Sequence, residues 1–456
     1  MPYMDTAKVI LVDPLGFRKG YLRHCHFLRD WSGSYILGYI PFPPLDLIYA
    51  AAYIRACGHD VHIIEASIKH LPHKKVANII KEKKPDFVLI PSTYFSLDDD
   101  KYLASLIRRN LPDVKIVFAG PLVTYNPSLV LSDRSADFVI LGDLEVPLLN
   151  IIGGDYSENI ASKENGKIIC GKRRLYDLNE LPVPARDLID NQAYNFAIFN
   201  KRNPVTTMTI SRGCPHSKCK FCHSLLYTLG EIRYRNIDSI LEEINEIVFK
   251  YKFKEIFFRD QTFTANRELV CKICEYIIKN NIPILWRASS RVDLVDKELL
   301  TLMYRAGCYQ LSFGFESCSQ KTLDMNVKGI TVEQSRNAAR WAKEAGIEIL
   351  GLFMFGMLGD TEDSMKQLFK FVLELDVDYA NFNAYFLIPG NPIYDEYLRD
   401  KSILLPQELI RRYTISAYIK FYCRPSYLLK QLAKTKSLKE LIFLFRTGLD
   451  AFLSYF

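Results

Sequence analysis

Three cysteines, Cys214, Cys219 and Cys222, fall within nine residues of this sequence. Gly213 and Pro215 flank the first of them, and residues of these two types end strands and favour loops. Three thiolates on one loop can hold three irons of a cubane iron–sulfur cluster, because thiolate is the ligand that such iron takes. No fourth cysteine follows nearby in the sequence, so one iron would stay open for a substrate or a cofactor.

A zinc site is the alternative interpretation of the same loop. Zinc prefers four ligands, often supplied by paired C-x2-C arms, and His216 or His223 would be the fourth ligand here. On the loop residues alone both interpretations stay open, and the cluster is the favoured one.

The composition indicates a large protein that folds around several cores. The chain has 456 residues, which suggests two to four domains, and 49% of them are hydrophobic. The net charge of +7 is the small difference between 59 basic and 52 acidic residues, so charge gives no argument for nucleic acid. The sequence contains no run of 18 apolar residues, and we expect no segment that spans a membrane.

The other cysteines are scattered along the chain. The first four residues, Met1 to Met4, do not resemble a signal peptide, so we expect a reducing cytoplasm and free buried thiols. Cys271 and Cys274 form a C-x2-C pair inside a helical pattern. We expect this pair to be structural and not a second metal site.

The elements that must position these residues follow two α/β patterns. In residues 1–150 apolar runs alternate with helical stretches, which predicts a parallel, doubly wound sheet with ligands beyond the carboxyl ends of its strands. The expected strands are 8–12, 61–64, 87–90, 115–119 and 138–141, and the expected helices are 45–57, 76–83 and 99–110. The strand ends carry Asp13, Pro14, Ser92, Thr93, Gly120, Pro121, Gly142, Asp143 and Glu145.

A linker is expected over residues 151–200, where the polar stretch 155–173 suits a hairpin or a linker and the prolines of 177–186 favour extended chain. Strands and helices alternate again over 201–395, and residues 396–456 are helical in pattern. The expected strands of this second part are 205–210, 255–259, 284–289, 310–315, 348–355 and 379–387. The expected helices are 237–251, 267–280, 296–306, 332–345 and 363–374, followed by 406–424, 426–433 and 437–456.

The cysteine loop with its flanks resembles the radical S-adenosylmethionine (SAM) superfamily, including the aromatic Phe221 before the last cysteine, which the resemblance implies is a SAM-binding residue. In that superfamily three cysteines hold a [4Fe-4S] cluster, and SAM chelates the fourth iron. The usual spacing is C-x3-C-x2-C, whereas this chain has C-x4-C-x2-C, so one residue among 215–218 must bulge out of the loop. The resemblance implies an open partial (β/α)6, TIM-like barrel with its chemistry at the carboxyl ends of the strands.

Residues 8–150 resemble the Rossmann-like cobalamin-binding domain found ahead of many radical SAM barrels. The resemblance implies that Ser92, Thr93, Gly120, Pro121, Gly142, Asp143 and Glu145 face cobalamin. The signature of a histidine ligand to cobalt, Asp-x-His-x-x-Gly, is absent from the sequence. We interpret His62 as a sheet residue, His24 and His26 lack the motif, and we expect cobalamin without a protein histidine ligand.

Four side chains near strand ends of the barrel are candidates for contacts with SAM. Asp260 lies in a segment that resembles the family's Asp-Asp-x-Phe-Thr, and Glu316 resembles a family position that faces SAM. Arg287 and Arg291 lie on and just beyond the third strand, where a planar guanidinium could pair with the SAM carboxylate. Turn chemistry or a surface ion pair would explain any one of these residues alone.

The resemblance implies reductive cleavage of SAM to a 5′-deoxyadenosyl radical and, with cobalamin in the first domain, methylation of an unactivated carbon. Cyclisation or oxidation, as in the anaerobic magnesium-protoporphyrin ester cyclases, is the enzymatic alternative. A non-catalytic cobalamin or metal sensor is the alternative from another class. We expect a small-molecule or lipid-like substrate, an external electron donor such as flavodoxin or ferredoxin, and no nucleic acid. The basic and apolar helix 437–456 would lie on a membrane surface or pack on the barrel.

Overall fold

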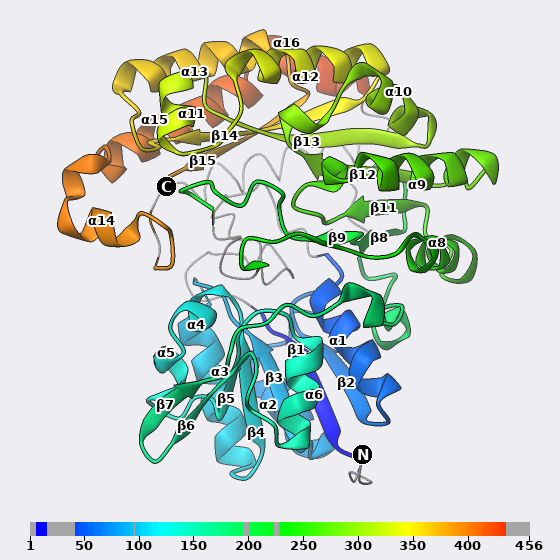
Figure 1. Ribbon diagram of the computed structural model, residues 1–456, viewed down its shortest axis with the longest axis vertical. Coiled ribbons are helices and arrows are strands. Elements are labelled where there is room, and N and C mark those ends of the chain that lie inside the picture. Colours follow the sequence, from blue (N-terminus) through cyan, green and yellow to red (C-terminus); the bar gives the residue numbers. More distant parts are fainter. Residues whose placement is uncertain are drawn as a thin grey trace.

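The computed structural model describes residues 6–15, 42–94, 96–194, 200–222, 228–385, 387 and 389–434. Two α/β units are stacked along the long axis of the molecule, the first shown in blue and cyan and the second in green to orange (Figure 1). His24, His26, His223 and the predicted helix 437–456 lie outside the described residues.

The first unit is a seven-stranded sheet in the order β2-β1-β3-β4-β5-β6-β7. Strands β1 to β5 are parallel, and β6 and β7 form an antiparallel hairpin that extends the sheet. Of the two expectations for residues 155–173 the hairpin is therefore correct, and part of the expected linker belongs to the sheet. The strands are Lys8–Asp13, Asp60–Glu65, Phe87–Pro91, Lys115–Ala119, Phe138–Ile140, Ile160–Glu164 and Lys167–Cys170.

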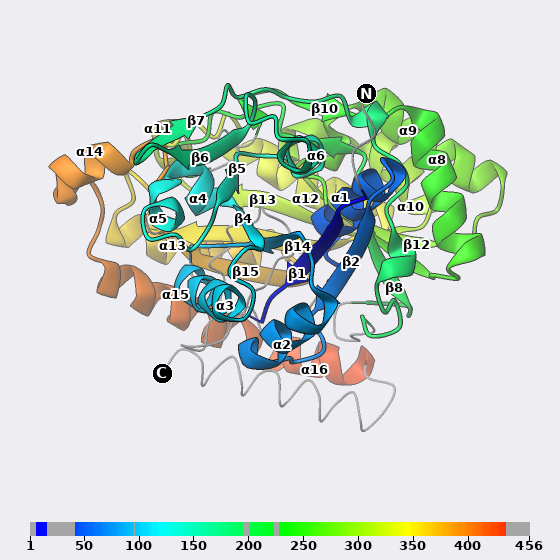
Figure 2. The same cartoon turned by 90° about the horizontal axis from the view of Figure 1, so that it is seen from below.

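Helices cover both faces of this sheet because neighbouring strand residues are buried on opposite sides. Val9 and Leu11 pack with α1 and α6, whereas Ile10 and Val12 pack with α2 and α3. Figure 2 shows α1 and α6 on one side of the sheet and α2 and α3 on the other. This is the doubly wound arrangement that the sequence predicts. The helices are α1 (Leu45–Ala56), α2 (His73–Lys83), α3 (Leu97–Asn110), α4 (Pro121–Tyr125), α5 (Ser128–Leu131) and α6 (Glu145–Gly153).

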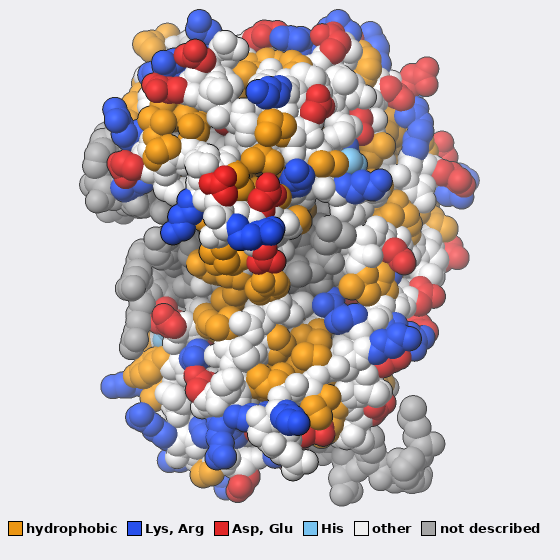
Figure 3. All heavy atoms as spheres, turned by 60° about the vertical axis from the view of Figure 1, so that its left-hand side comes forward, with side chains coloured by type: hydrophobic (Ala, Val, Ile, Leu, Met, Phe, Trp, Pro, Cys, Tyr) orange, Lys and Arg blue, Asp and Glu red, His pale blue; other side chains and the backbone are white. Residues whose placement is uncertain are grey.

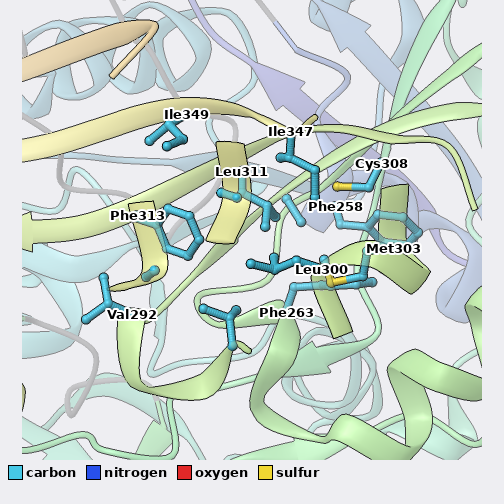
Figure 4. Close-up of a cluster of buried hydrophobic side chains, with 14 of the residues drawn as sticks. Phe258, Phe263, Val292, Leu300, Met303, Cys308, Leu311, Phe313, Ile347 and Ile349 are labelled. Carbon is cyan, nitrogen blue, oxygen red and sulfur yellow. The ribbon is translucent and has the colours of Figure 1, made fainter. Parts of the chain in front are cut away.

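The second unit is an open six-stranded parallel sheet in the order β15-β14-β13-β12-β11-β8, as expected for a partial barrel. Its outer face packs on the helices through a large apolar core, part of which Figure 4 shows around Leu311 and Phe313. The strands are β8 (Val205–Met208), β11 (Glu255–Phe258), β12 (Leu285–Ser290), β13 (Cys308–Glu316), β14 (Glu348–Phe355) and β15 (Tyr379–Ala384). The helices are α8 (Ile237–Asn245), α9 (Arg267–Lys279), α10 (Lys297–Arg305), α11 (Gln320–Met325), α12 (Val332–Ala345) and α13 (Glu362–Glu374).

The C-terminal region closes the free edge of β15. It contains α14 (Tyr394–Arg399), α15 (Gln407–Tyr422) and α16 (Pro425–Lys434). The hydroxyl of Tyr418 accepts a hydrogen bond from the backbone N–H of Phe382 at 3.1 Å. The hydroxyl of Tyr422 accepts from the N–H of Ala380 and donates to its carbonyl. Two tyrosines of α15 thus satisfy backbone groups that an edge strand would expose.

Among the described residues, no helix is both long and apolar enough to cross a membrane. On the face shown in Figure 3, hydrophobic side chains gather at mid-height, where the two units meet.

Candidate active site

The cysteine loop begins directly after the first strand of the barrel and is fixed at its base by Asp260. Its first two residues, Ser211–Arg212, form β9, which pairs with β10 (Arg233–Tyr234). The Asp260 carboxylate accepts hydrogen bonds from the N–H groups of Ile210 and Ser211, at 3.1 and 2.6 Å, and from the Ser211 hydroxyl at 2.6 Å. Burial raises the pKa of Asp260 to about 6, against these hydrogen bonds. Asp260 therefore holds the loop, and its contact with SAM stays a prediction.

The extra residue of the C-x4-C spacing is accommodated by a left-handed turn. Ser217 has φ +41°, and its hydroxyl donates to the Cys214 carbonyl at 2.6 Å. The same turn contacts the loop that contains Val327, because Nε2 of His216 lies 2.6 Å from the Val327 carbonyl oxygen. Gly329 leaves room for this imidazole, since a Cβ there would lie 2.6 Å from His216 Cε1.

The loop 326–329, which His216 contacts, also forms a hydrogen bond with the second half of the cysteine loop. The N–H of Lys220 donates to the Asn326 carbonyl at 3.0 Å. Residues 326–329 are braced in turn by Arg291, which donates to the carbonyls of Lys328 and Gly329 and forms a two-point pair with Asp293. The structure thus places Arg291 beside the cysteine loop as a support.

The three thiols have the donor chemistry that an iron–sulfur cluster requires. Cys219 is buried, and Cys214 and Cys222 are partly exposed. Burial raises the pKa of the Cys219 thiol, and the positive charges of Lys328 and Arg291 offset part of that rise. In the described ranges, no group of His, Cys, Asp or Glu side chains is arranged to hold one metal ion. A cubane cluster makes a different demand, because each thiolate binds a separate iron, and the three-thiol donor set fits it.

Lys328 contacts both Glu316 and Phe221 and was not predicted as a site residue. Lys328 Nζ lies 2.8 Å from Glu316 Oε1 and 5.6 Å from the centroid of the Phe221 ring. Glu316 has φ +61° and follows an irregularity in the pairing of β13 with β14. Such bulges re-aim side chains near active sites. Nothing in a single sequence distinguishes Lys328 from the other lysines, because its partner lies twelve residues away.

Arg287 belongs to another part of the barrel. It is paired in register with Gln310, six residues before Glu316 on β13, which corresponds to roughly 20 Å along the strand. Its guanidinium donates to Asn200 Oδ1 at 3.0 Å and lies 4.4 Å from the Phe257 ring centroid. The structure does not bring Arg287 together with Glu316.

The carboxyl ends of β3 and β4 form the part of the first unit that fits cobalamin. The Ser92 hydroxyl is fully buried and has no hydrogen-bond partner, whereas Thr93 is bonded to Ser96. Gly120 has φ +127°, and a Cβ there would lie 1.9 Å from the Ser92 carbonyl oxygen. Pro121 begins α4. Glycine is required at position 120 because the Ser92 backbone occupies the place of a Cβ. The unpartnered Ser92 hydroxyl is a polar group that a ligand could satisfy, and the contact of Ser92, Thr93, Gly120 and Pro121 with cobalamin stays a prediction.

The other residues predicted to bind cobalamin, Gly142, Asp143 and Glu145, lie against arginine side chains. Gly142 has φ +114° and lies against Arg173. Asp143 and Glu145 form ion pairs with arginines of the second unit. Their contact with cobalamin stays a prediction.

Two further expectations concern residues outside the site. His62 lies on β2, partly exposed, with Nε2 3.4 Å from an oxygen of Asp60. Cys271 and Cys274 are free thiols on α9, where Cys274 is buried in the barrel core and Cys271 packs against it.

Comparisons with known proteins agree with this geometry. Residues 208–372 match the radical SAM superfamily, and residues 39–152 match the B12 binding domain. The chain is 31% identical over 420 residues to an uncharacterized methyltransferase of Pyrococcus horikoshii, covering 86% of this chain and 90% of that protein. It is 26% identical over 377 residues to the anaerobic magnesium-protoporphyrin IX monomethyl ester cyclase of Rubrivivax gelatinosus, covering 79% and 67%.

The same fold occurs in a solved structure of the radical SAM methyltransferase TsrM from Kitasatospora setae. The TM-score is 0.70 at 16% identity, covering 86% of this chain and 76% of that one. The chain therefore belongs to the radical SAM enzymes that carry a B12-binding domain ahead of the barrel, and its cofactors are a [4Fe-4S] cluster, SAM and cobalamin.

Proposed function

We propose that this protein is a C-methyltransferase that adds a methyl group to an unactivated carbon of a small molecule. The observation that carries the proposal is the contact between the two cofactor edges. Arg212, two residues before Cys214, is ion-paired with Glu145, which begins the helix after β5 of the B12-binding unit. This pair brings the start of the cysteine loop against the carboxyl edge of the first sheet, and transfer of a methyl group requires the two cofactors to lie near each other.

The chain's own residues have distinct roles in this proposal. Cys214, Cys219 and Cys222 hold the cluster. Glu316 and Lys328 form a buried pair of opposite charges, and either partner can turn to a polar group of SAM. When bound, the cluster would supply the electron that cleaves one SAM, and cobalamin would pass on a methyl group taken from a second SAM; the protein's residues would orient the cofactors and exclude water.

Exclusion of water is supported by the apolar surroundings of the cysteine loop. Phe221, next to Cys222, packs against a small apolar cluster that includes Leu358, Tyr385 and Ile393. A dry site protects a reactive radical from side reactions.

Ring formation or oxidation is the second candidate function. The similarity to the magnesium-protoporphyrin ester cyclase favours it, because it extends over both units of the chain. An external electron donor of the flavodoxin or ferredoxin type completes either reaction, and contact of residues 437–456 with a membrane surface would suit a lipid-like substrate.

The test is anaerobic reconstitution with iron, sulfide and hydroxocobalamin, followed by reduction in the presence of SAM with a deuterated methyl group. We expect four irons per chain, one corrinoid, 5′-deoxyadenosine and, with candidate small molecules from the host, a product heavier by one labelled methyl group. An oxidised product without the label would replace methyl transfer by the second candidate function.

The matched control is a variant in which Cys214, Cys219 and Cys222 are all replaced by alanine. It should bind hydroxocobalamin but lose the visible charge-transfer absorbance and all cleavage of SAM. Four irons retained in this variant would overturn the assignment of the cluster, and stoichiometric zinc in the wild type would replace the cluster by a zinc site.

A further inference from the structure

A buried set of charges joins the two units directly at the cysteine loop. Arg212 donates to both oxygens of Glu145, at 3.0 and 2.5 Å, and lies 3.4 Å from Asp143. Arg233, directly opposite Arg212 in the β9–β10 ribbon, lies 2.7 Å from the other oxygen of Asp143. The side chains of Arg212, Glu145 and Asp143 are each no more than 5% exposed.

A second buried group lies behind this one and ties α1 of the first unit to α8 of the barrel. Tyr49 donates its hydroxyl hydrogen to Glu243 at 3.1 Å and accepts a hydrogen bond from Arg235 at 2.7 Å. Glu243 also pairs with Arg235 and, at 2.6 Å, with Arg186. Burial alone would favour the neutral acid, but the two arginines hold the pKa of Glu243 below its ordinary value. These four buried groups connect α1 to α8, and Nη1 of Arg186 and Nε of Arg235 have no hydrogen-bond partner.

The charges around Arg212 differ from the group around Tyr49 because they join the cysteine loop to the carboxyl edge of the first sheet. Arg212 is two residues from Cys214, so its guanidinium is attached to the start of the cluster loop. Glu145 is the first residue of α6, three residues after Gly142 at the carboxyl edge of the first sheet. A two-point pair between a guanidinium and a carboxylate fixes orientation as well as distance.

We infer that Arg212 is a positioning residue that couples the cobalamin edge of the first unit to the cluster loop, and that Asp143 and Glu145 serve this coupling instead of contacting cobalamin. The consequence of this coupling for catalysis rests on the proposed function. The coupling itself can be measured without any turnover of substrate. Ordering of the β5–α6 edge by a bound corrinoid should pass through Arg212 to the residues that hold the cluster, and the coupling should be reciprocal.

The test compares hydrogen exchange of the backbone amides of residues 211–222 with and without hydroxocobalamin, on the full chain. In the wild type we expect the corrinoid to slow exchange in this loop at least fivefold. In Arg212→Met the affinity for hydroxocobalamin should stay within about twofold of wild type, while the slowing in the loop disappears. Arg212→Lys keeps the charge but not the planar fork, and should retain only part of the effect.

Arg55→Met is the matched control. Arg55 of α1 also forms a two-point pair, with Asp187 in the segment between the two units, but both side chains are nearly half exposed. This variant removes the same type of side chain from an Arg–carboxylate pair and should behave as wild type. If Arg212→Met does not fold, Glu145→Gln tests the same pair with almost no change in volume.

The outcomes separate this inference from the proposed function. Failure of the wild type to bind hydroxocobalamin would overturn the proposed function. Binding that slows exchange in residues 211–222 equally in wild type, Arg212→Met and Glu145→Gln would overturn the coupling alone. A large loss of corrinoid affinity in Glu145→Gln but not in Arg212→Met would indicate that Glu145 contacts cobalamin, and this result would also overturn the inference.

Discussion

The substitution Ser92→Ala is expected to stabilise the cofactor-free protein and to weaken its binding of cobalamin. The Ser92 hydroxyl is 0% exposed and has no hydrogen-bond partner, while the backbone N–H of Ser92 donates to the Ala119 carbonyl at 2.7 Å. A buried polar group without a partner costs about 1–3 kcal/mol. Removal of the oxygen leaves the backbone bond in place, so the free energy of unfolding should rise by about 1 kcal/mol.

The same hydroxyl should donate or accept one hydrogen bond when cobalamin is bound. A hydrogen bond of this kind contributes roughly 0.5–1.5 kcal/mol net, which corresponds to about twofold to tenfold in affinity. Urea unfolding of the cofactor-free chain and titration with hydroxocobalamin measure the two effects separately. Their opposite signs make the prediction specific, because ordinary damage to the fold would lower both quantities.

Ser96→Ala is the matched control. Its hydroxyl donates to Asp100 at 2.7 Å and accepts from the N–H of Thr93 at 3.0 Å, so its removal leaves buried groups without partners. We expect this variant to be less stable by about 1–3 kcal/mol. A Ser92→Ala protein that is destabilised like Ser96→Ala, with unchanged affinity for cobalamin, would refute the placement of cobalamin beside Ser92.

Three further predictions follow from single residues. Glu316→Gln should weaken SAM binding on the order of tenfold to a hundredfold, because hydrogen bonds to charged groups contribute roughly 1.5–3 kcal/mol, and iron analysis should show an intact cluster; loss of iron would make Glu316 a structural residue. The pKa of Asp260 rises from 3.8 to about 6 in the folded protein, so the folded state binds more protons between these values and the free energy of unfolding should fall by about 3 kcal/mol as pH rises through that window. Urea unfolding at several pH values should show this component in wild type and not in Asp260→Asn, and an equal pH dependence in both would contradict the burial argument. The electron paramagnetic resonance spectrum of bound cob(II)alamin should lack nitrogen superhyperfine splitting from a protein histidine, and such splitting would direct attention to His24 and His26.

The alternation of strands and helices was accessible from the sequence because it depends on local patterns. Strands β4 and β14 and helix α12 have the bounds that the apolar runs and helical spacing predict. The short helices α4, α5 and α11 were not predicted, since four to six residues are too few to show a helical period.

The residues around the cysteine loop show where local patterns stop being informative. Spacing indicated a bulge in the loop, but the turn at Ser217 and the docking of His216 on Val327 depend on a segment more than a hundred residues away. The position of Lys328 in the site likewise depends on its contacts with Glu316 and Phe221. A lysine acquires a role from its partners, and partners distant in sequence are brought together only by folding.

The sequence by itself determined the two α/β units and their order and predicted the cluster ligands, because cysteine spacing, apolar runs and Gly or Pro breaks act over a few residues. Only the tertiary structure decided what the charged side chains do. Asp260 and Arg291 brace loops, Asp143 and Glu145 pair with arginines across the junction, and the hydroxyl of Ser92 is left buried without a partner. The physical reason is that the energy of a charge or a hydrogen bond depends on burial and on the groups within a few ångströms, and tertiary packing, within each unit and between the two, decides both.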